Sequence, residues 1–346
     1  MRKLLTAVVG LGRIGWQYHI PNIIEHEGFE LVAVADSMIE RLEEAREKFN
    51  VNGYSDYHEL LENEKLDLIV IASPTPFHCE QTIAAIEHGV DVFLEKPMAQ
   101  SLEEADLIID RIKKTGRKVM VYQPHRATSE AMAVKSILKS GVIGQVYMIK
   151  RATSGYIRRN DWQSQKRFGG GMLNNYGSHY IDQLLYLTSS TAKDVLCLMR
   201  KIASIGDADD VLKAVIVTQN DIIFDLDINM AAAIQLPPWT IMGSRGTVIQ
   251  EKRTDGTLIF KIRYCNESEF KVLDLNDELA APGRSYNNFD NIKWYEKEII
   301  VSDFKPLNFY DKCYSYYALN EEPFVPIHQT REVMRVIDEC RKSAGW

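Results

Sequence analysis

The stretch Leu4-Leu5-Thr6-Ala7-Val8-Val9-Gly10-Leu11-Gly12-Arg13-Ile14-Gly15 decides the fold of this 346-residue chain. Its first six residues, mostly apolar, predict a buried strand, and a G-x-G-x-x-G turn follows directly. Gly10 permits a tight turn, Gly12 lets a backbone approach a pyrophosphate, and Gly15 allows close packing of a helix on the strand. The helix N-terminus that follows attracts an anion, so the stretch predicts a phosphate cradle.

A carboxylate lies at the expected distance from this turn. Asp36 is 21 residues beyond Gly15, at the end of the second predicted strand. An acidic side chain there accepts hydrogen bonds from ribose hydroxyls and repels a 2′-phosphate. Residues 37–39 contain no arginine that would hold such a phosphate. The turn and Asp36 together predict NAD as the cofactor and make NADP the less favoured one, although Asp36 alone would also suit a helix N-cap.

The pattern of predicted helices and strands changes after residue 123. Short apolar strands alternate with helices up to residue 123, which predicts a doubly wound parallel sheet of the Rossmann type. These strands are expected at 4–9, 31–35, 66–72, 90–94 and 118–122. After Pro124, strands are expected at 145–153, 195–202, 212–218, 222–230, 247–250 and 258–264, and helices at 132–138, 176–187 and 329–343. Strands that follow one another predict a mostly antiparallel sheet. We therefore expect an α/β domain over 1–123 and an α+β domain over 124–346, with the site between them.

Composition excludes several classes of function. The 41 basic and 48 acidic residues give a net charge of −7, which disfavours a nucleic-acid partner. No run of about 18 apolar residues predicts a membrane span. The five cysteines form no C-x-x-C pair, so neither a disulfide framework nor a metal site is expected, and a reducing, cytoplasmic location fits.

Glu95-Lys96-Pro97 ends the fourth predicted strand, beside the crevice where doubly wound sheets bind ligands. A lysine there can donate to an alcohol or carbonyl oxygen, and partial burial lowers its pKa toward a useful range. Glu95 would orient it. The alternative reading of the tripeptide is a surface ion pair.

A second block, residues 169–182, carries a candidate base. Asn175, His179 and Asp182 are spaced i, i+4 and i+7, so one helix face presents all three. A histidine that faces a crevice suits proton transfer from a hydroxyl group. Taken singly, His179 would also suit a structural role.

In this order and spacing, the glycine turn, Glu95-Lys96-Pro97 and Gly177-x-His179-x-x-Asp182 resemble the glucose–fructose oxidoreductase / inositol dehydrogenase (Gfo/Idh/MocA) family, and residues 241–247 resemble its Gly-x-x-Gly-Thr turn. The resemblance implies a Rossmann domain followed by an open-faced sheet that joins subunits as a homodimer or homotetramer. It also implies hydride transfer between NAD(P) and a sugar, polyol or related hydroxy compound. Lys96 and His179 match the family's catalytic lysine and histidine.

One position departs from the family pattern. Asn175 stands where the family usually has an aspartate, four residues before the histidine. An amide cannot ionise and cannot raise the basicity of a neighbouring imidazole, but it can hydrogen-bond a substrate hydroxyl. Proton abstraction then falls to His179 and Lys96, with Asn175 as the third catalytic candidate.

The other candidates surround these residues. Loops after the third and fifth strands supply further cofactor contacts, and aromatic or cationic side chains suit a sugar or an acidic sugar. The candidate cofactor-binding residues are Gly10, Gly12, Arg13, Ile14, Gly15, Asp36, Ser73, Thr75, His78, Glu95, Lys96, Gln123 and Arg126. The candidate substrate-binding residues are Lys96, Trp162, Asn175, Tyr176 and His179, followed by Tyr156, Lys166 and Arg167. His125, with Gln123 and Arg126, would meet the nicotinamide side of the crevice, and interdomain packing is the alternative there.

Three functions fit these observations. The first is an NAD-dependent sugar or polyol dehydrogenase. The second, which Asn175 motivates, retains and recycles NAD in an elimination, epimerisation or glycoside cleavage. The third is a non-catalytic, NAD-dependent regulatory protein, against which the Lys96–His179 pair argues.

Overall fold

The computed structural model describes residues 2–270, 273 and 292–346. Six parallel strands form the N-terminal sheet in the order β3-β2-β1-β4-β5-β6. Their bounds are β1 (Leu4–Val9), β2 (Phe29–Ala35), β3 (Asn52–Tyr54), β4 (Leu68–Ile71), β5 (Asp91–Leu94) and β6 (Val119–Val121). This is the Rossmann strand order, which reverses between β1 and β4 and leaves a crevice at their carboxyl ends. The predicted doubly wound sheet is confirmed.

Helices cover both faces of this sheet, as β-strands buried on both sides require. They are α1 (Ile20–Glu25), α2 (Ile39–Phe49), α3 (Tyr57–Asn63), α4 (His78–Glu87) and α5 (Leu102–Thr115). A single π-helical turn, Gly15–His19, joins the glycine turn to α1. The short edge strand β3 was not predicted, because its three residues Asn-Gly-Tyr carry no apolar run.

The C-terminal half forms an eight-stranded sheet in the order β14-β13-β12-β11-β7-β10-β9-β8. Its strands are β7 (Val146–Ser154), β8 (Ala192–Arg200), β9 (Val211–Thr218), β10 (Ile223–Asn229), β11 (Trp239–Gly243), β12 (Gly246–Lys252), β13 (Leu258–Tyr264) and β14 (Tyr295–Ile300). Only the β7–β10 pair is parallel within the described strands, so the expected antiparallel character is confirmed. The sequence did not predict β11 or β14. A double proline precedes β11, and the edge strand β14 has no buried residue that would give an alternating pattern.

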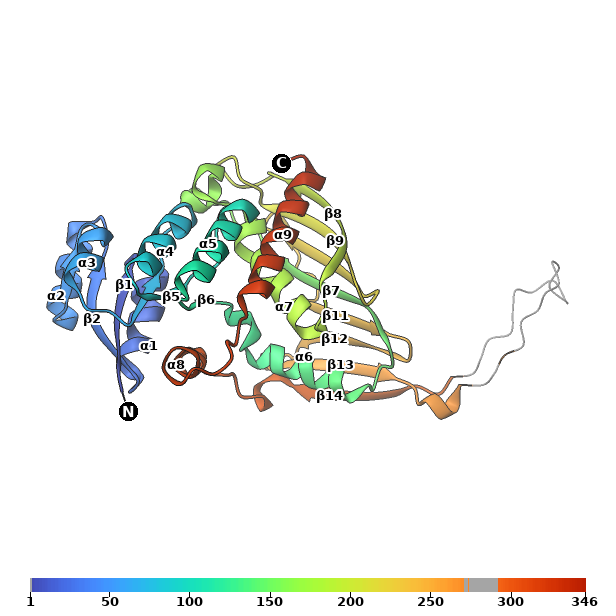
Figure 1. Cartoon of the computed structure of the whole chain (residues 1–346). Helices are drawn as coiled ribbons and strands as arrows, with labels where there is room; N and C mark the ends of the chain where they lie inside the picture. The colour runs from blue at the N-terminus through green and yellow to red at the C-terminus, as the bar shows by residue number, and fades with distance from the viewer. Residues whose placement is uncertain (1, 271–272, 274–291) are drawn as a thin grey trace.

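Three helices lie along one face of this sheet, toward the Rossmann half: α6 (Ser129–Ser140), α7 (Ser178–Thr188) and α9 (Ile327–Ala344). Helix α9 runs between α5 and β8 and ties the two halves together (Figure 1). Its Arg331 donates to Asp106 of α5 at 2.8 Å, and its Asp338 accepts the Leu102 N–H at the start of α5 at 2.9 Å. The site between the halves is therefore held by a rigid helix.

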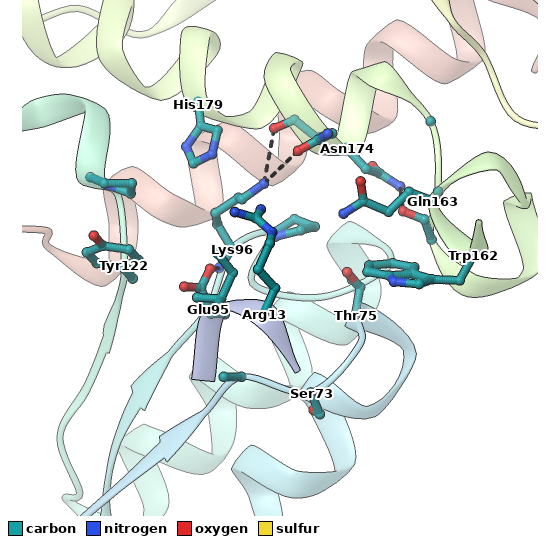
Figure 2. Close-up of a pocket in the computed structure, with 18 residues that line it drawn as sticks. Arg13, Ser73, Thr75, Glu95, Lys96, Tyr122, Trp162, Gln163, Asn174 and His179 are labelled. Atoms are coloured by element: carbon teal, nitrogen blue, oxygen red, sulfur yellow. Dashed lines mark hydrogen bonds between the residues drawn. The ribbon is translucent and has the colours of Figure 1, made fainter. Parts of the chain in front are cut away.

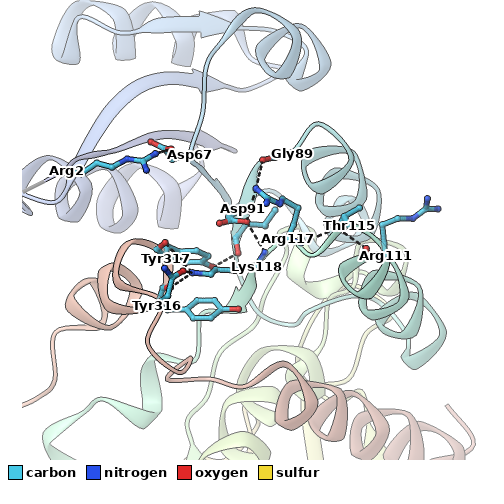
Figure 3. Close-up of polar contacts among 12 residues, drawn as sticks. Arg2, Asp67, Gly89, Asp91, Arg111, Thr115, Arg117, Lys118, Tyr316 and Tyr317 are labelled. Atoms are coloured by element: carbon cyan, nitrogen blue, oxygen red, sulfur yellow. Dashed lines mark hydrogen bonds and ion pairs between the residues drawn. The ribbon is translucent and has the colours of Figure 1, made fainter.

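One C-terminal helix belongs in space to the N-terminal half. Helix α8 (Phe309–Leu319) packs its buried Tyr310 and Tyr317 on the Rossmann sheet. The Tyr317 hydroxyl accepts the Met120 N–H at 3.0 Å, and Lys118 Nζ donates to the Tyr316 carbonyl at 2.6 Å (Figure 3). A cation at a helix C-terminus satisfies its free carbonyl groups. The division at residues 123 and 124 stays a prediction along the chain, and α8 crosses it in three dimensions.

Among the helices of the described residues, none combines the length and apolar character that a membrane crossing requires.

Candidate functional site

The glycine turn after β1 has the geometry that the sequence predicted. Gly10 has φ +92°, and a Cβ there would lie 2.6 Å from the Ser73 backbone nitrogen. A Cβ on Gly15 would lie 2.0 Å from the Gly10 carbonyl oxygen. In contrast, a Cβ on Gly12 would meet nothing within 4 Å. The protein's own packing requires glycine at 10 and 15, whereas at 12 the space lies open for a ligand.

Asp36 at the end of β2 lies beside this turn. Its carboxylate accepts the Leu11 N–H at 2.7 Å and the Met38 N–H at 2.9 Å. Helix α2 is capped by Met38, so Asp36 is not its N-cap. Arg41, on the first turn of α2, donates to the same carboxylate at 3.1 Å. Arg41 was not predicted, because it lies beyond residues 37–39 and belongs to no motif.

A pocket opens at the crevice, between the Rossmann loops and the segment from Trp162 to His179 (Figure 2). It brings together nine of the predicted residues: Arg13, Ile14, Ser73, Thr75, Glu95, Lys96, Trp162, Asn175 and His179. Its wall also contains residues that were not predicted as site residues, namely Ala72, Pro97, Tyr122, Pro124, Gln163, Gly169, Gly170, Gly171 and Asn174. Sequence alone gave no signal for Tyr122 and Gln163. The three glycines belong to the block that suggested His179.

Lys96 lies at the centre of this pocket, with Arg13 beside it (Figure 2). Its Nζ donates to the backbone carbonyl and to the side-chain Oδ1 of Asn175, both at 3.2 Å. Burial lowers the pKa of Lys96 to about 8, although the Glu95 carboxylate raises that pKa and Arg13 lowers it further. At this pKa about a tenth of Lys96 is neutral at pH 7 and able to accept a proton, and the fraction rises to about half near pH 8.

His179 lies on the first turn of α7, after a π-helical turn over Leu173–Gly177. Its ring stacks on that of His125, with centroids 4.2 Å apart and planes 11° apart. Burial lowers the pKa of His179 well below its usual value, and the positive charge of Lys96 adds to this. Its buried Nδ1 has no hydrogen-bond partner in the part of the chain that the structure describes. His179 is thus a neutral imidazole whose Nδ1 is not used in a hydrogen bond within the described structure.

Glu95 contacts the backbone of Lys96 rather than its side-chain amine. Its Oε2 accepts the backbone N–H of Lys96 at 3.1 Å, and its Oε1 lies 2.9 Å from His19 Nε2. Glu95 therefore acts on Lys96 through the backbone and through its charge. His19 was missed in the sequence, where it stands four residues beyond the glycine pattern with no motif of its own.

Several predicted residues lie outside the pocket wall. Arg126 is buried and forms a bidentate pair with Asp182, with its NH2 2.6 Å from Oδ1. Asp182 therefore faces Arg126 rather than the pocket that Asn175 and His179 line. His78 is buried between the Pro97 and Ser73 carbonyl oxygens, at 2.8 and 2.9 Å, and joins two loops of the pocket from inside. The other predicted residues that do not line this pocket are Gln123, His125, Tyr156, Lys166, Arg167 and Tyr176, together with Gly10, Gly12, Gly15 and Asp36 of the glycine turn and β2.

Comparison with known proteins identifies the family. A family model described as "Oxidoreductase family, NAD-binding Rossmann fold" (GFO_IDH_MocA) matches residues 4–123, and one described as "GFO/IDH/MocA C-terminal domain" matches residues 131–249. The chain belongs to the Gfo/Idh/MocA oxidoreductase family. This confirms the resemblance seen in the motifs, and it confirms a nicotinamide dinucleotide as the cofactor of the N-terminal fold.

Similar proteins in this family differ in the activities they are named for. D-glucoside 3-dehydrogenase of Escherichia coli (strain K12) is 30% identical over 192 residues, which cover 53% of this chain and 54% of that protein. The 2,7-anhydro-N-acetylneuraminate hydratase of Mediterraneibacter gnavus is 28% identical over 220 residues, covering 61% and 58%. The chain thus spans little more than half the length of these relatives. A solved structure of an NAD-binding protein from Listeria innocua superimposes with a TM-score of 0.84, at 25% identity, and covers 100% of this chain and 98% of that one.

Proposed function

We propose that this chain is an NAD-dependent dehydrogenase that oxidises a secondary alcohol of a sugar, a polyol or a related hydroxy compound. The observation that carries the proposal is the placement of a lysine amine with a lowered pKa in one pocket with a neutral histidine, next to the glycine turn. Family membership and the glucoside dehydrogenase among the relatives support the same class of reaction.

The residues of the turn fit NAD. The open space above Gly12 admits a pyrophosphate, and Arg13 lines the pocket as a cation beside it. Asp36, held by two backbone N–H groups, is fixed where the adenosine ribose hydroxyls would donate to it. The carboxylate also repels a 2′-phosphate, so we propose NAD as the preferred cofactor. A bound nicotinamide would accept the hydride from the substrate carbon.

The chain's own residues would handle the proton. The neutral form of Lys96 accepts the hydroxyl proton of the substrate, and Asn175 holds the amine in place through two hydrogen bonds. His179 supplies a second neutral acceptor, because its imidazole is uncharged and its Nδ1 is unpartnered in the described structure. Trp162 at the outer wall offers a face on which a sugar ring stacks.

An absorbance assay tests this function. The purified protein is incubated with NAD and a panel of sugars, sugar acids and polyols, and NADH is followed at its absorption maximum. We expect turnover with at least one member, and a loss of about 10²- to 10⁴-fold in kcat for Lys96→Met. The matched control is Lys150→Met, on the sheet strand β7, which should leave kcat unchanged. Bound NADH without turnover on any compound would contradict a dehydrogenase.

A second candidate is a redox-neutral reaction in which NAD stays bound and is recycled. Asn175 favours it, because the amide replaces the aspartate of the family. A relative named as a hydratase, not a dehydrogenase, also supports it. Cofactor that copurifies with the protein, together with product formation and no net NADH, would favour this candidate over the first.

We also propose that the eight-stranded sheet joins two or four copies of the chain. One of its faces is left uncovered by the described helices, and Leu196 and Leu198 on β8 are 62% and 53% exposed there. Light scattering after size-exclusion chromatography measures the mass and would contradict the proposal by showing a monomer. The cytoplasmic location stays a prediction.

A further inference from the structure

A buried histidine connects helix α8 to the loop that carries Lys96. His19 is fully buried at the end of the π-helical turn that follows the glycine motif. Its Nε2 lies 2.9 Å from Glu95 Oε1, and its Nδ1 lies 2.8 Å from the Tyr310 hydroxyl. Tyr310 is itself buried and comes from α8, 291 residues away along the chain.

These contacts form one unbroken chain of hydrogen bonds. The Tyr310 hydroxyl pairs with His19 Nδ1, His19 Nε2 pairs with Glu95 Oε1, and Glu95 Oε2 accepts the backbone N–H of Lys96. Each Glu95 oxygen thus has its own hydrogen-bond partner, one on the His19 ring and one on the Lys96 backbone. At the other end of the same residue, the Lys96 Nζ donates hydrogen bonds to Asn175.

Aromatic rings fix the orientation of His19. Phe93 and Tyr122 meet its ring edge-to-face, with centroids 5.6 and 5.3 Å away. Both rings also pack against Phe309 of α8, at 5.8 and 4.8 Å. The histidine therefore cannot turn away from Glu95 without disturbing the aromatic cluster.

We infer that His19 and Tyr310 are positioning residues that hold Glu95, and through it the backbone of Lys96, in the geometry needed for proton transfer. The inference rests on the proposed function of Lys96 and adds two residues that lie outside the pocket wall. It also gives α8 a role in the site, although α8 lies outside the pocket wall. Loss of the chain would let the Glu95 carboxylate move, so that the Lys96 backbone N–H would lose its acceptor and the amine would lose a nearby negative charge.

Two matched pairs of variants test the inference. Tyr310→Phe removes one hydroxyl from the chain, whereas Tyr314→Phe removes a hydroxyl one turn later on α8 that donates to the Arg2 carbonyl instead. His19→Gln keeps a donor that reaches Glu95, whereas His19→Leu removes it. We expect kcat to fall about tenfold in Tyr310→Phe and about 100-fold in His19→Leu, with NADH affinity within twofold of the original protein. Tyr314→Phe should keep its kcat, and His19→Gln should recover most of the loss.

The pH dependence separates a positioning role from a merely structural one. Because the Glu95 carboxylate raises the pKa of Lys96, its displacement should move the midpoint of Lys96 titration below about 8. This midpoint is measured from the rate at which acetic anhydride modifies Lys96 at different pH values, followed by peptide mass spectrometry. The measurement needs no turnover. A moved midpoint in a protein that oxidises no compound of the panel would uphold the inference and refute the proposed function.

The opposite results would overturn the inference. These are an unchanged kcat and an unchanged Lys96 midpoint in both Tyr310→Phe and His19→Leu, or equal losses in Tyr310→Phe and Tyr314→Phe that follow their unfolding temperatures. If His19→Leu does not fold, the comparison of Tyr310→Phe with Tyr314→Phe decides the matter, since Tyr310→Phe removes only one hydroxyl from the chain and Tyr314→Phe removes one outside it.

Discussion

The Nζ of Lys96 donates to both oxygens of Asn175, the backbone carbonyl and the side-chain amide, each at 3.2 Å. The backbone carbonyl would hold the amine whatever the side chain at 175. The amide adds a second acceptor without adding charge. The substitution that the sequence flagged as a departure from the family thus lies directly against the amine that we propose as the base, and it leaves burial as the main influence on the pKa of that amine.

Replacing Asn175 with Asp should make Lys96 more basic. An ionised carboxylate within hydrogen-bond distance favours the charged form of the amine and should raise the pKa of Lys96 from about 8 by about one to three units. Since the neutral amine is the base, the acid limb of the kcat/KM profile should move to higher pH and activity near pH 7 should fall. A profile recorded from pH 6 to 10 measures this. A limb that stays in place would show that Lys96 is not the titrating base.

Asp36 and Arg41 should together set the choice between NAD and NADP. Asp36→Ser removes the acceptor for the ribose hydroxyls and frees Arg41 from its 3.1 Å ion pair, so that the guanidinium can meet a 2′-phosphate. We expect NADH affinity to fall about 10- to 100-fold and NADPH affinity to rise. Fluorescence titration with both reduced cofactors measures the change. Adding Arg41→Ala should abolish the gain for NADPH; a gain that persists would assign phosphate binding to another residue.

The stacked imidazoles should make the fold sensitive to acid. Burial, with Arg151 and Lys96 nearby, lowers the pKa of His125 to about 4, whereas an unfolded histidine titrates near 6.5. Between these values the unfolded chain binds a proton that the folded chain does not, so stability falls as pH drops below about 6.5 and levels off below about 4. The cost is about 1.4 kcal/mol for each unit of difference. His179 changes in the same direction.

His125→Gln tests this linkage. Urea unfolding at several pH values between 4 and 7.5 should show a shallower decline in the free energy of unfolding than in the original protein, because one of the two low-pKa groups is gone. Carboxylates contribute equally to both proteins, so the difference between the two curves isolates the histidine. Parallel curves would mean that the His125 pKa is unshifted.

Local patterns predicted much of this molecule. The apolar runs located five of the six Rossmann strands to within one or two residues, since a strand buried on both faces leaves an unbroken apolar signature. The motifs likewise located Lys96, Asn175 and His179, because each lies at the end of a regular element that faces the crevice. Contacts between residues far apart in the sequence give no comparable local pattern. Nothing near Tyr310 in the sequence indicates that α8 returns to the first sheet and meets His19 there.

Arg126 shows the opposite limit. Its place after the fifth predicted strand suggested a cofactor contact. However, the helix that carries His179 also carries Asp182, and Arg126 and Asp182 form a buried ion pair at 2.6 Å. A sequence shows that a cation and a carboxylate exist, whereas only their packing shows that neither is available to a ligand. Sequence spacing placed Asp182 on the face of His179, and tertiary structure gave it a different partner.

Two glycines of the opening motif should separate stability from cofactor binding. Gly15→Ala places a methyl group 2.0 Å from the Gly10 carbonyl oxygen, which forces the turn apart and should cost about 1–3 kcal/mol of unfolding free energy without any ligand. Gly12→Ala meets nothing within 4 Å, so its unliganded stability should stay within about 0.5 kcal/mol of the original. The same methyl group occupies the space where a pyrophosphate would approach, so NADH should raise the unfolding temperature of the original protein but not that of Gly12→Ala. Calorimetry with and without NADH measures both effects. If NADH stabilises Gly12→Ala as much as the original, the pyrophosphate does not lie against this turn.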